Sequence, residues 1–224
     1  NPKKIKSSKL PVVFDKRISN GLIGYLAGAI SGPSIARGTS FLKDSLGKQI
    51  FKKDVTIIDD PGINRGLGSK PFDGEGIQVS KKEIVSNGKL NTWILNTSTA
   101  KKLNFKTTGN ASRSVGAPPG VSTSNFFMTN GILSYDDMIK SIKYGFYANE
   151  LIGMGVNLVT GDYSMGASGM LIENGEITHA VSEVTIASNL TEMFLNLSAA
   201  NDLEFKYRTN APTVLIENMT LAGK

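Results

Sequence analysis

The alternation of apolar and polar positions predicts an antiparallel β-meander in the last third of the chain. Its β-rich or alternating segments are 156–160, 170–173 and 177–187. Asn174-Gly175 joins the second segment to the third, and Asn-Gly readily accepts the positive φ angles that a type I′ hairpin turn needs. Within the last segment the parity of the apolar positions changes near Ser182-Glu183. A β-bulge is therefore expected there.

Shorter patterns predict further strands and about four short helices. Strands are expected at 10–15, 55–58, 77–86, 90–95, 204–209 and 212–217, with a second hairpin turn at Asn87-Gly88. Helices are expected at 20–30, 98–103, 134–142 and 189–197, with Asn20, Ser134 and Asn189 as N-caps. These elements predict an α+β fold that is mostly antiparallel β-sheet, in hairpins and a meander, and partly barrel-like.

The helix expected from Asn20 carries three glycines, Gly21, Gly24 and Gly28, close together on one side. Each glycine in a helix interior costs about 1 kcal/mol relative to alanine. We therefore expect another part of the protein to pack closely against this glycine face and to compensate for that cost.

The longest stretch without periodicity is 107–131, and loops of this length are usually functional or disordered. Polar side chains in this stretch and elsewhere suit the binding of a peptide backbone. We predict as cleft-lining residues Arg37, Asp73, Glu75, Arg113, Asn125, Asp162 and Tyr163. Asp73 and Glu75 each precede a glycine, so tight turns are the first interpretation there. Acid–base use of Asp73, Glu75 and Asp162 is the alternative.

Composition excludes several kinds of catalytic site. The chain of 224 residues has no cysteine, so it contains no disulfide and no thiol nucleophile, and a reducing, cytoplasmic setting is indicated. Zinc sites commonly use at least two His or Cys ligands, and His179 is the single histidine. Its position within a strand favours packing over ligation. The glycine-rich segments 66–70 and 153–155 match neither a phosphate loop nor a dinucleotide fingerprint. We expect no catalytic residue and no metal site in this chain.

The formal net charge is +6, from 25 basic and 19 acidic residues. Pairs of lysines lie in unrelated segments, which favours a solvated basic surface over a nucleic-acid interface. No apolar run approaches the roughly 20 residues that a membrane-spanning helix needs. Neither nucleic acid nor a membrane is an expected partner.

Several motifs are distributed along the whole chain: 11–15 (PVVFD), 21–32 (GLIGYLAGAISG), 37–42 (RGTSFL), 71–76 (PFDGEG), 161–164 (GDYS), 173–177 (ENGEI), 181–187 and 216–223. Together they resemble the TldD/PmbA family, in its PmbA (TldE) branch. Members have long been labelled modulators of DNA gyrase and are associated with a metalloprotease assembly. The resemblance implies that 1–224 is the C-terminal domain of a longer protein whose N-terminal half is absent from this sequence.

The resemblance also carries expectations about activity. The catalytic subunit of this family, TldD, binds zinc through an H-E-x-x-x-H helix and a C-terminal cysteine, and it pairs with TldE around a chamber that cleaves unfolded peptides. The similar region here, around 21–29, has neither histidine nor glutamate, and cysteine is absent. The resemblance thus implies a non-catalytic subunit of a heterodimeric metallopeptidase, which lines the chamber and holds an extended peptide along a strand edge.

In this interpretation the expected partners are a TldD-like catalytic subunit, which would hold the zinc, and an extended or unfolded peptide. Self-association is a further option. The alternative function, from a different class, is a regulatory binding protein that acts on DNA gyrase or on a toxin-antitoxin system.

Overall fold

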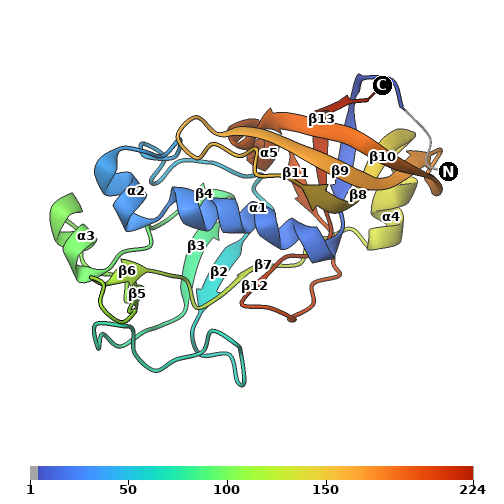
Figure 1. Ribbon diagram of the computed structural model, residues 1–224. Helices are drawn as coiled ribbons and strands as arrows, with labels where there is room; N and C mark the ends of the chain where they lie inside the picture. Colours follow the sequence, from blue (N-terminus) through green and yellow to red (C-terminus); the bar gives the residue numbers. More distant parts are fainter. Residues whose placement is uncertain (1–4, 224) are drawn as a thin grey trace.

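The larger of two main sheets partly closes into a barrel (Figure 1). The computed structural model describes residues 5–223. The strand order is β1-β8-β9-β10-β13-β11, and β1 also pairs with β13, which closes a ring of five strands. The bounds are β1 Ser8–Phe14, β8 Tyr144–Ile152, β9 Asp162–Glu173, β10 Glu176–Asn189, β11 Leu197–Ala199 and β13 Val214–Ala222. Closure leaves few strand edges exposed on this sheet.

The longest hairpin of the barrel joins β9 to β10 as the sequence predicts. Asn174 and Gly175 have φ angles of 52° and 81°, and Glu173 pairs with Glu176 across the turn. The β-bulge is also confirmed, because the register shifts between Val181 and Val184, where Glu183 has a φ of 57°.

The smaller sheet has the order β12-β7-β2-β3-β4 and lies below the barrel in Figure 1. Its strands are β2 Ile57–Asp60, β3 Lys82–Ser86, β4 Lys89–Leu90, β7 Asn125–Met128 and β12 Thr209–Asn210. A separate pair, β5 Ala111–Ser112 and β6 Gly120–Val121, lies beside it. Among the named strands every pairing is antiparallel except β1 with β8 and β12 with β7. The expected α+β class with mostly antiparallel sheet is therefore confirmed.

Several strand predictions differ from the structure. The prediction of a strand at 204–209 is wrong except at Thr209, because the backbone N–H groups of Lys206 and Tyr207 donate to the Asn210 side chain and hold this segment as a loop. The prediction of a strand at 156–160 is wrong, because the backbone N–H of Gly161 donates to the Asn157 carbonyl and closes a turn. The strand that pairs with β9 is β8, which the sequence patterns did not predict. The strand expected at 90–95 ends at Leu90, since Ile94 leaves the sheet and exchanges backbone hydrogen bonds with Ile30 and Gly32 at the end of α1. A further difference is β7, a fully buried strand within the stretch expected to be a loop.

Five helices lie within residues 5–223, one more than expected. Their bounds are α1 Lys16–Ala29, α2 Gly32–Arg37, α3 Thr97–Leu103, α4 Tyr135–Lys140 and α5 Leu190–Leu195. Ser134 and Asn189 are N-caps as predicted. Asn20 is not, because α1 begins earlier, with Asp15 as its N-cap. No helix of the described chain is long and apolar enough to cross a membrane.

The helix α1 lies across the front of the molecule, between the barrel and the smaller sheet (Figure 1). Its inward side, Leu22, Ile23 and Leu26, is buried in the main hydrophobic core. A fully buried aliphatic side chain contributes about 1.5–3 kcal/mol. This packing orients the helix and thereby decides which of its sides faces outward.

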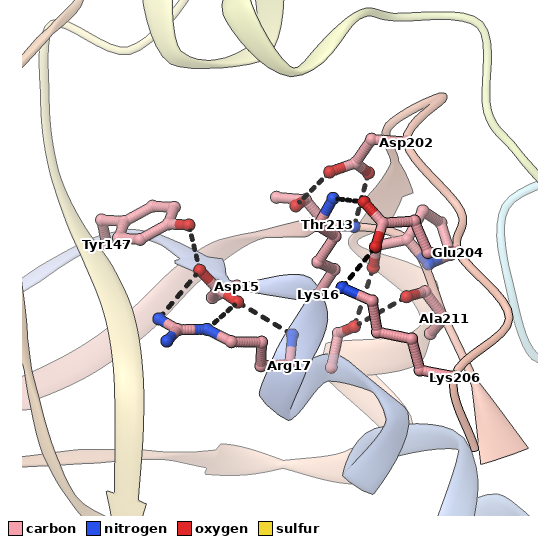
Figure 2. A network of polar contacts seen from close by, with 11 residues as sticks. Asp15, Lys16, Arg17, Tyr147, Asp202, Glu204, Lys206, Ala211 and Thr213 are labelled. Atoms are coloured by element: carbon pink, nitrogen blue, oxygen red, sulfur yellow. Dashed lines mark hydrogen bonds and ion pairs between the residues drawn. The ribbon is translucent and has the colours of Figure 1, made fainter.

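A polar network fixes the start of α1 (Figure 2). The Asp15 carboxylate accepts hydrogen bonds from the backbone N–H of Arg17 at 2.8 Å, from Arg17 Nε at 2.9 Å and from the Tyr147 hydroxyl at 2.5 Å. Because Tyr147 belongs to β8, this carboxylate joins the barrel wall to the helix. Burial opposes the ionisation of Asp15, but the bonds from Arg17 and Tyr147 outweigh it, so the pKa of Asp15 lies below its usual value.

A second part of the network ties the segment 201–213 to the same turn of α1 (Figure 2). Glu204 forms ion pairs with Lys16 and with Lys206. These two lysines lower the pKa of the Glu204 carboxyl to about 2. Asp202 accepts hydrogen bonds from the backbone N–H and the hydroxyl of Thr213, both at 2.8 Å. The cations on this side of α1 are thus largely matched by carboxylates.

The substitution Asp15→Asn tests the first part of the network. Since the folded pKa is depressed below 3.8, the contribution of the ionised carboxylate is complete above the unfolded pKa and is lost as the pH falls through the folded pKa. We expect the substitution to lower the free energy of unfolding by about 1–3 kcal/mol near neutral pH. In urea unfolding, this difference from the wild type should shrink below about pH 4.

The control is Asp136→Asn, at an exposed position in the first turn of α4. It should change stability by only about 0.3–1 kcal/mol through the helix dipole. An Asp15→Asn difference that stays constant from neutral to strongly acidic pH would contradict the role given to this carboxylate.

Candidate functional site

One side of α1 has no side chains at Gly21 and Gly24 and is not covered by another segment of the described chain; we call it the bare side of α1. A Cβ atom added at Gly21 or at Gly24 would meet nothing within 4 Å in the described chain, and both glycines are exposed. At Gly28 it would lie 2.9 Å from Leu158 Cδ1. The prediction that this glycine face is packed is therefore confirmed at Gly28 and wrong at the other two positions. Two exposed glycines weaken the helix without any compensating packing within the described residues.

A groove of about 390 Å³ continues from the bare side of α1. Ala27, Gly28 and Ser31 form its floor, on the same side of the helix as the exposed glycines. The residues that complete it are Ile94, Val121, Ser122, Thr123, Arg208 and Thr209. We define these nine residues as the α1 groove.

Two short strand edges border the α1 groove. In the described sheets β6 pairs only with β5, and β12 pairs only with β7, so each has one edge without a partner strand. Val121 of β6 and Thr209 of β12 line the groove. Asn20 Nδ2 lies 3.4 Å from the Thr209 carbonyl and links α1 to this wall. A floor of small residues beside strand edges allows another backbone to approach closely.

Arg208 is the single charged side chain that lines the groove. Its Nη2 donates a hydrogen bond to the Thr123 carbonyl at 2.6 Å. Among residues 5–223, no carboxylate oxygen lies within 4 Å of its guanidinium, unlike the cations at the start of α1.

Of the predicted cleft-lining residues, Asp73, Glu75 and Arg113 come closest together. Asp73 is only 4% exposed and accepts hydrogen bonds from the backbone N–H groups of Glu75, Ile77 and Ala111 at 2.9–3.0 Å. Burial opposes its ionisation, but the three backbone donors lower the pKa of Asp73 below its usual value. Its oxygens hold the turn 73–77 against β5.

Glu75 belongs to this turn, and Arg113 lies next to it. Glu75 Oε2 accepts hydrogen bonds from the backbone N–H of Thr97 at 2.8 Å and from its hydroxyl at 2.6 Å, at the first residue of α3. Arg113 is exposed, and its backbone nitrogen would lie 3.1 Å from a Cβ added at Gly74. The two carboxylates therefore connect the loop to its neighbours, with donors that are already present in the chain.

Asn125 ties a second loop to the smaller sheet. It is 2% exposed, accepts from the backbone N–H of Gly68 at 2.8 Å, and donates to the Asp60 carbonyl and the Ser69 hydroxyl at 2.7 and 2.8 Å. The oxygen and the nitrogen of this side-chain amide both form hydrogen bonds that hold the segment 60–69.

The remaining three predicted residues lie elsewhere. Arg37 is the exposed last residue of α2, and Asp162 is the exposed first residue of β9, where it accepts from the Thr160 hydroxyl at 2.6 Å. Tyr163 is 1% exposed and packs edge-on against Phe14 and Tyr25 beneath α1. Burial raises its pKa, and its hydroxyl has no hydrogen-bond partner in the described chain. The structure does not gather the seven residues into one site.

The α1 groove offers no set of metal ligands. The segment 16–29 contains no His, Cys, Asp or Glu, and no group of three such residues that could hold a metal ion occurs in residues 5–223. A zinc site needs three or four such ligands, so these residues do not fit zinc. His179 is half-exposed on β10, with its Nε2 3.6 Å from Glu173 Oε2.

Residue patterns did not point to Arg208, Ser122 or Thr209. Ser122 comes from the stretch without periodicity, and Arg208 and Thr209 come from a segment expected to be a strand. Arg208 and Thr123 are 85 residues apart in the sequence. The three glycines of α1 did carry a signal. Their helical spacing indicated a special face, although the sequence could not show whether that face is covered.

Comparison with known proteins identifies the family of this chain. Residues 7–223 match the family model described as PmbA/TldA metallopeptidase C-terminal domain. The chain is 40% identical over 225 residues to metalloprotease PmbA of Escherichia coli O157:H7, covering 100% of this chain and 48% of that protein. It spans about half the length of the curated relatives it matches.

Two solved structures share the fold. The structure of a proposed modulator of DNA gyrase from Thermotoga maritima has a TM-score of 0.90 and 33% identity, with 99% of this chain and 51% of that chain covered. TldE from Thermococcus kodakarensis has a TM-score of 0.88 and 26% identity, with 100% and 52% covered. The resemblance drawn from the sequence motifs is confirmed. This chain belongs to the family of PmbA/TldA metallopeptidase C-terminal domains.

Proposed function

We propose that the chain is part of the non-catalytic subunit of a TldD/TldE-type heterodimeric metallopeptidase. In this role it lines the chamber that admits unfolded peptides, and the TldD-like partner holds the zinc. The observation that carries the proposal is the bare side of α1. The segment that the family resemblance likens to the zinc helix of catalytic members, 21–29, lies in this helix. It contains no His, Cys, Asp or Glu, and Gly21 and Gly24 are exposed.

The chemistry of the α1 groove supports binding without catalysis. Its nine residues are aliphatic or hydroxyl-bearing apart from Arg208, and none is a carboxylate or a histidine that could act as a general base. An extended peptide could lie on the small residues of the floor and pair with the edge of β6 or β12. Such pairing recognises backbone groups, which suits a substrate defined by being unfolded.

The chain has no cysteine and therefore no disulfide, which suits the reducing cytoplasm, where disulfides rarely persist. We therefore place the proposed heterodimer in the cytoplasm. A chamber shared by two subunits would leave the chemistry to one of them and the positioning of the peptide to the other.

The alternative is a regulatory protein that binds DNA gyrase or a toxin-antitoxin component. It is favoured by the description of the Thermotoga relative as a proposed gyrase modulator and by the net charge of +6. Binding to DNA or gyrase without any partner subunit, weakening steeply as salt rises, would support this alternative over the heterodimer.

Assembly is the direct test of the proposal. The full-length protein, mixed with its TldD-like partner, should give one species in native mass spectrometry at the sum of the two masses. Cleavage of an unfolded peptide should need both subunits. If no complex forms and the partner cleaves the peptide equally well alone, the proposal is wrong.

A change on the bare side of α1 tests where the peptide lies. Gly24→Ala should raise the free energy of unfolding by about 0.5–1 kcal/mol, because alanine favours the helix and its Cβ meets no atom. Gly24→Leu adds a larger side chain at the same place and should weaken peptide binding by the assembled heterodimer. Fluorescence anisotropy with a labelled unfolded peptide measures this, and native mass spectrometry checks that the heterodimer still forms.

The matched control is Lys102→Leu, which also places an exposed leucine on a helix, but on α3 and outside the groove. It should leave peptide affinity unchanged. Equal affinities for the Gly24→Leu variant and the wild type would show that the bare side of α1 is not where the peptide binds.

A further inference from the structure

We propose that the α1 groove prefers peptide segments that carry an aspartate or glutamate side chain, with Arg208 as the residue that pairs with this carboxylate. The inference rests on the proposed function, since it names the class of peptide that the same groove takes. Its basis is the distribution of charge around α1.

The side chains that line the groove are uncharged except for Arg208. Eight of its nine lining residues have uncharged side chains, and the ninth is Arg208. A peptide lysine placed there would find no carboxylate in the lining, whereas an aspartate would find a guanidinium. Arg208 is exposed, so this difference is moderated by water, as it is for other ion pairs at a protein surface.

The other cations near the first turn of α1 already have partners. Lys16 and Lys206 both pair with Glu204, and Arg17 pairs with Asp15 at 2.9 Å (Figure 2). Arg208 lies two residues beyond Lys206 and has no carboxylate within 4 Å in the described chain. It is therefore the cation in this region that remains available to an acidic ligand.

The guanidinium of Arg208 is also held in position. Its Nη2 donates to the Thr123 carbonyl at 2.6 Å, and its own carbonyl accepts from the backbone N–H of Phe126 at 2.8 Å, beside β7. A guanidinium has five N–H donors, so others remain for a carboxylate after the bond to Thr123. Because one donor is already fixed, the Arg208 side chain loses less conformational entropy when it binds a carboxylate.

The short strand edges make this one contact important. β6 and β12 each contain two residues, so only a few backbone hydrogen bonds to a peptide could form along them. A groove of about 390 Å³ is within the size range of ligand pockets, but it accommodates only a short segment. With so few backbone bonds available, a charge-assisted contact would contribute a large share of the affinity.

The experiment compares three unfolded peptides of equal length that differ at one central position, Asp, Asn or Lys. All are N-acetylated and C-amidated, so that the side chain supplies the only difference in charge. Fluorescence anisotropy measures their binding to the full-length protein, alone and in its heterodimer. Because Arg208 is exposed, we expect the Asp peptide to bind about two- to fivefold more tightly than the Asn peptide, and the Lys peptide to bind most weakly. This preference should shrink as salt is added.

The variant Arg208→Gln should remove the preference for Asp and leave the affinity for the Asn peptide unchanged. Arg208→Lys keeps the charge and should retain part of the preference. The control Arg65→Gln removes an exposed arginine outside the groove and should behave as the wild type does. Thermal unfolding and heterodimer formation check that each variant is folded.

The results distinguish failure of this inference from failure of the proposed function. Equal binding of the Asp and Asn peptides to the wild type overturns the inference and leaves the proposed function standing, since peptides still bind. The Asn peptide is also prepared with a free C-terminal carboxylate; if this form binds and the central residue has no effect, the inference is overturned as well. If none of the peptides binds and no heterodimer forms, the proposed function fails together with the inference.

Discussion

The docking of α1 between the barrel and the smaller sheet is the constraint on which the other features depend. Leu22, Ile23 and Leu26 are buried on its inward side, and Asp15 joins its first turn to Tyr147 of β8. Burial of one side of a helix determines what the opposite side presents. A single helix thus contributes both to the core and to the surface that we propose as the binding site.

Buried polar side chains perform a second structural task, since they hold long segments that have little regular structure. Asp59 is fully buried and accepts from the backbone N–H of Ser124 at 2.6 Å and from Asn110 Nδ2 at 2.8 Å. Asp73 and Asn125 bind neighbouring loops in the same way. Backbone groups away from water need such partners. Carboxylates that resemble catalytic candidates in the sequence therefore serve here to order loops.

In the heterodimer that we propose, this chain keeps the scaffold of a metallopeptidase while its partner holds the metal. The scaffold keeps the helix and the strand edges that can position a peptide backbone, whereas the helix segment 16–29 has no side chain that binds zinc. A shared fold does not decide function, which depends on the side chains at the site. Positioning and chemistry can then be divided between two related subunits.

The sequence by itself determined the features that depend on local backbone preference. The two Asn-Gly turns, the bulge at Glu183 and the N-caps Ser134 and Asn189 follow from near neighbours in the chain. The motifs also sufficed to indicate the family. Only the tertiary structure decided that β4 ends after two residues, that the glycine side of α1 is open at Gly21 and Gly24, and that Arg208 meets Thr123 across 85 residues. These outcomes depend on which distant segments pack together, and residue periodicity does not encode that information.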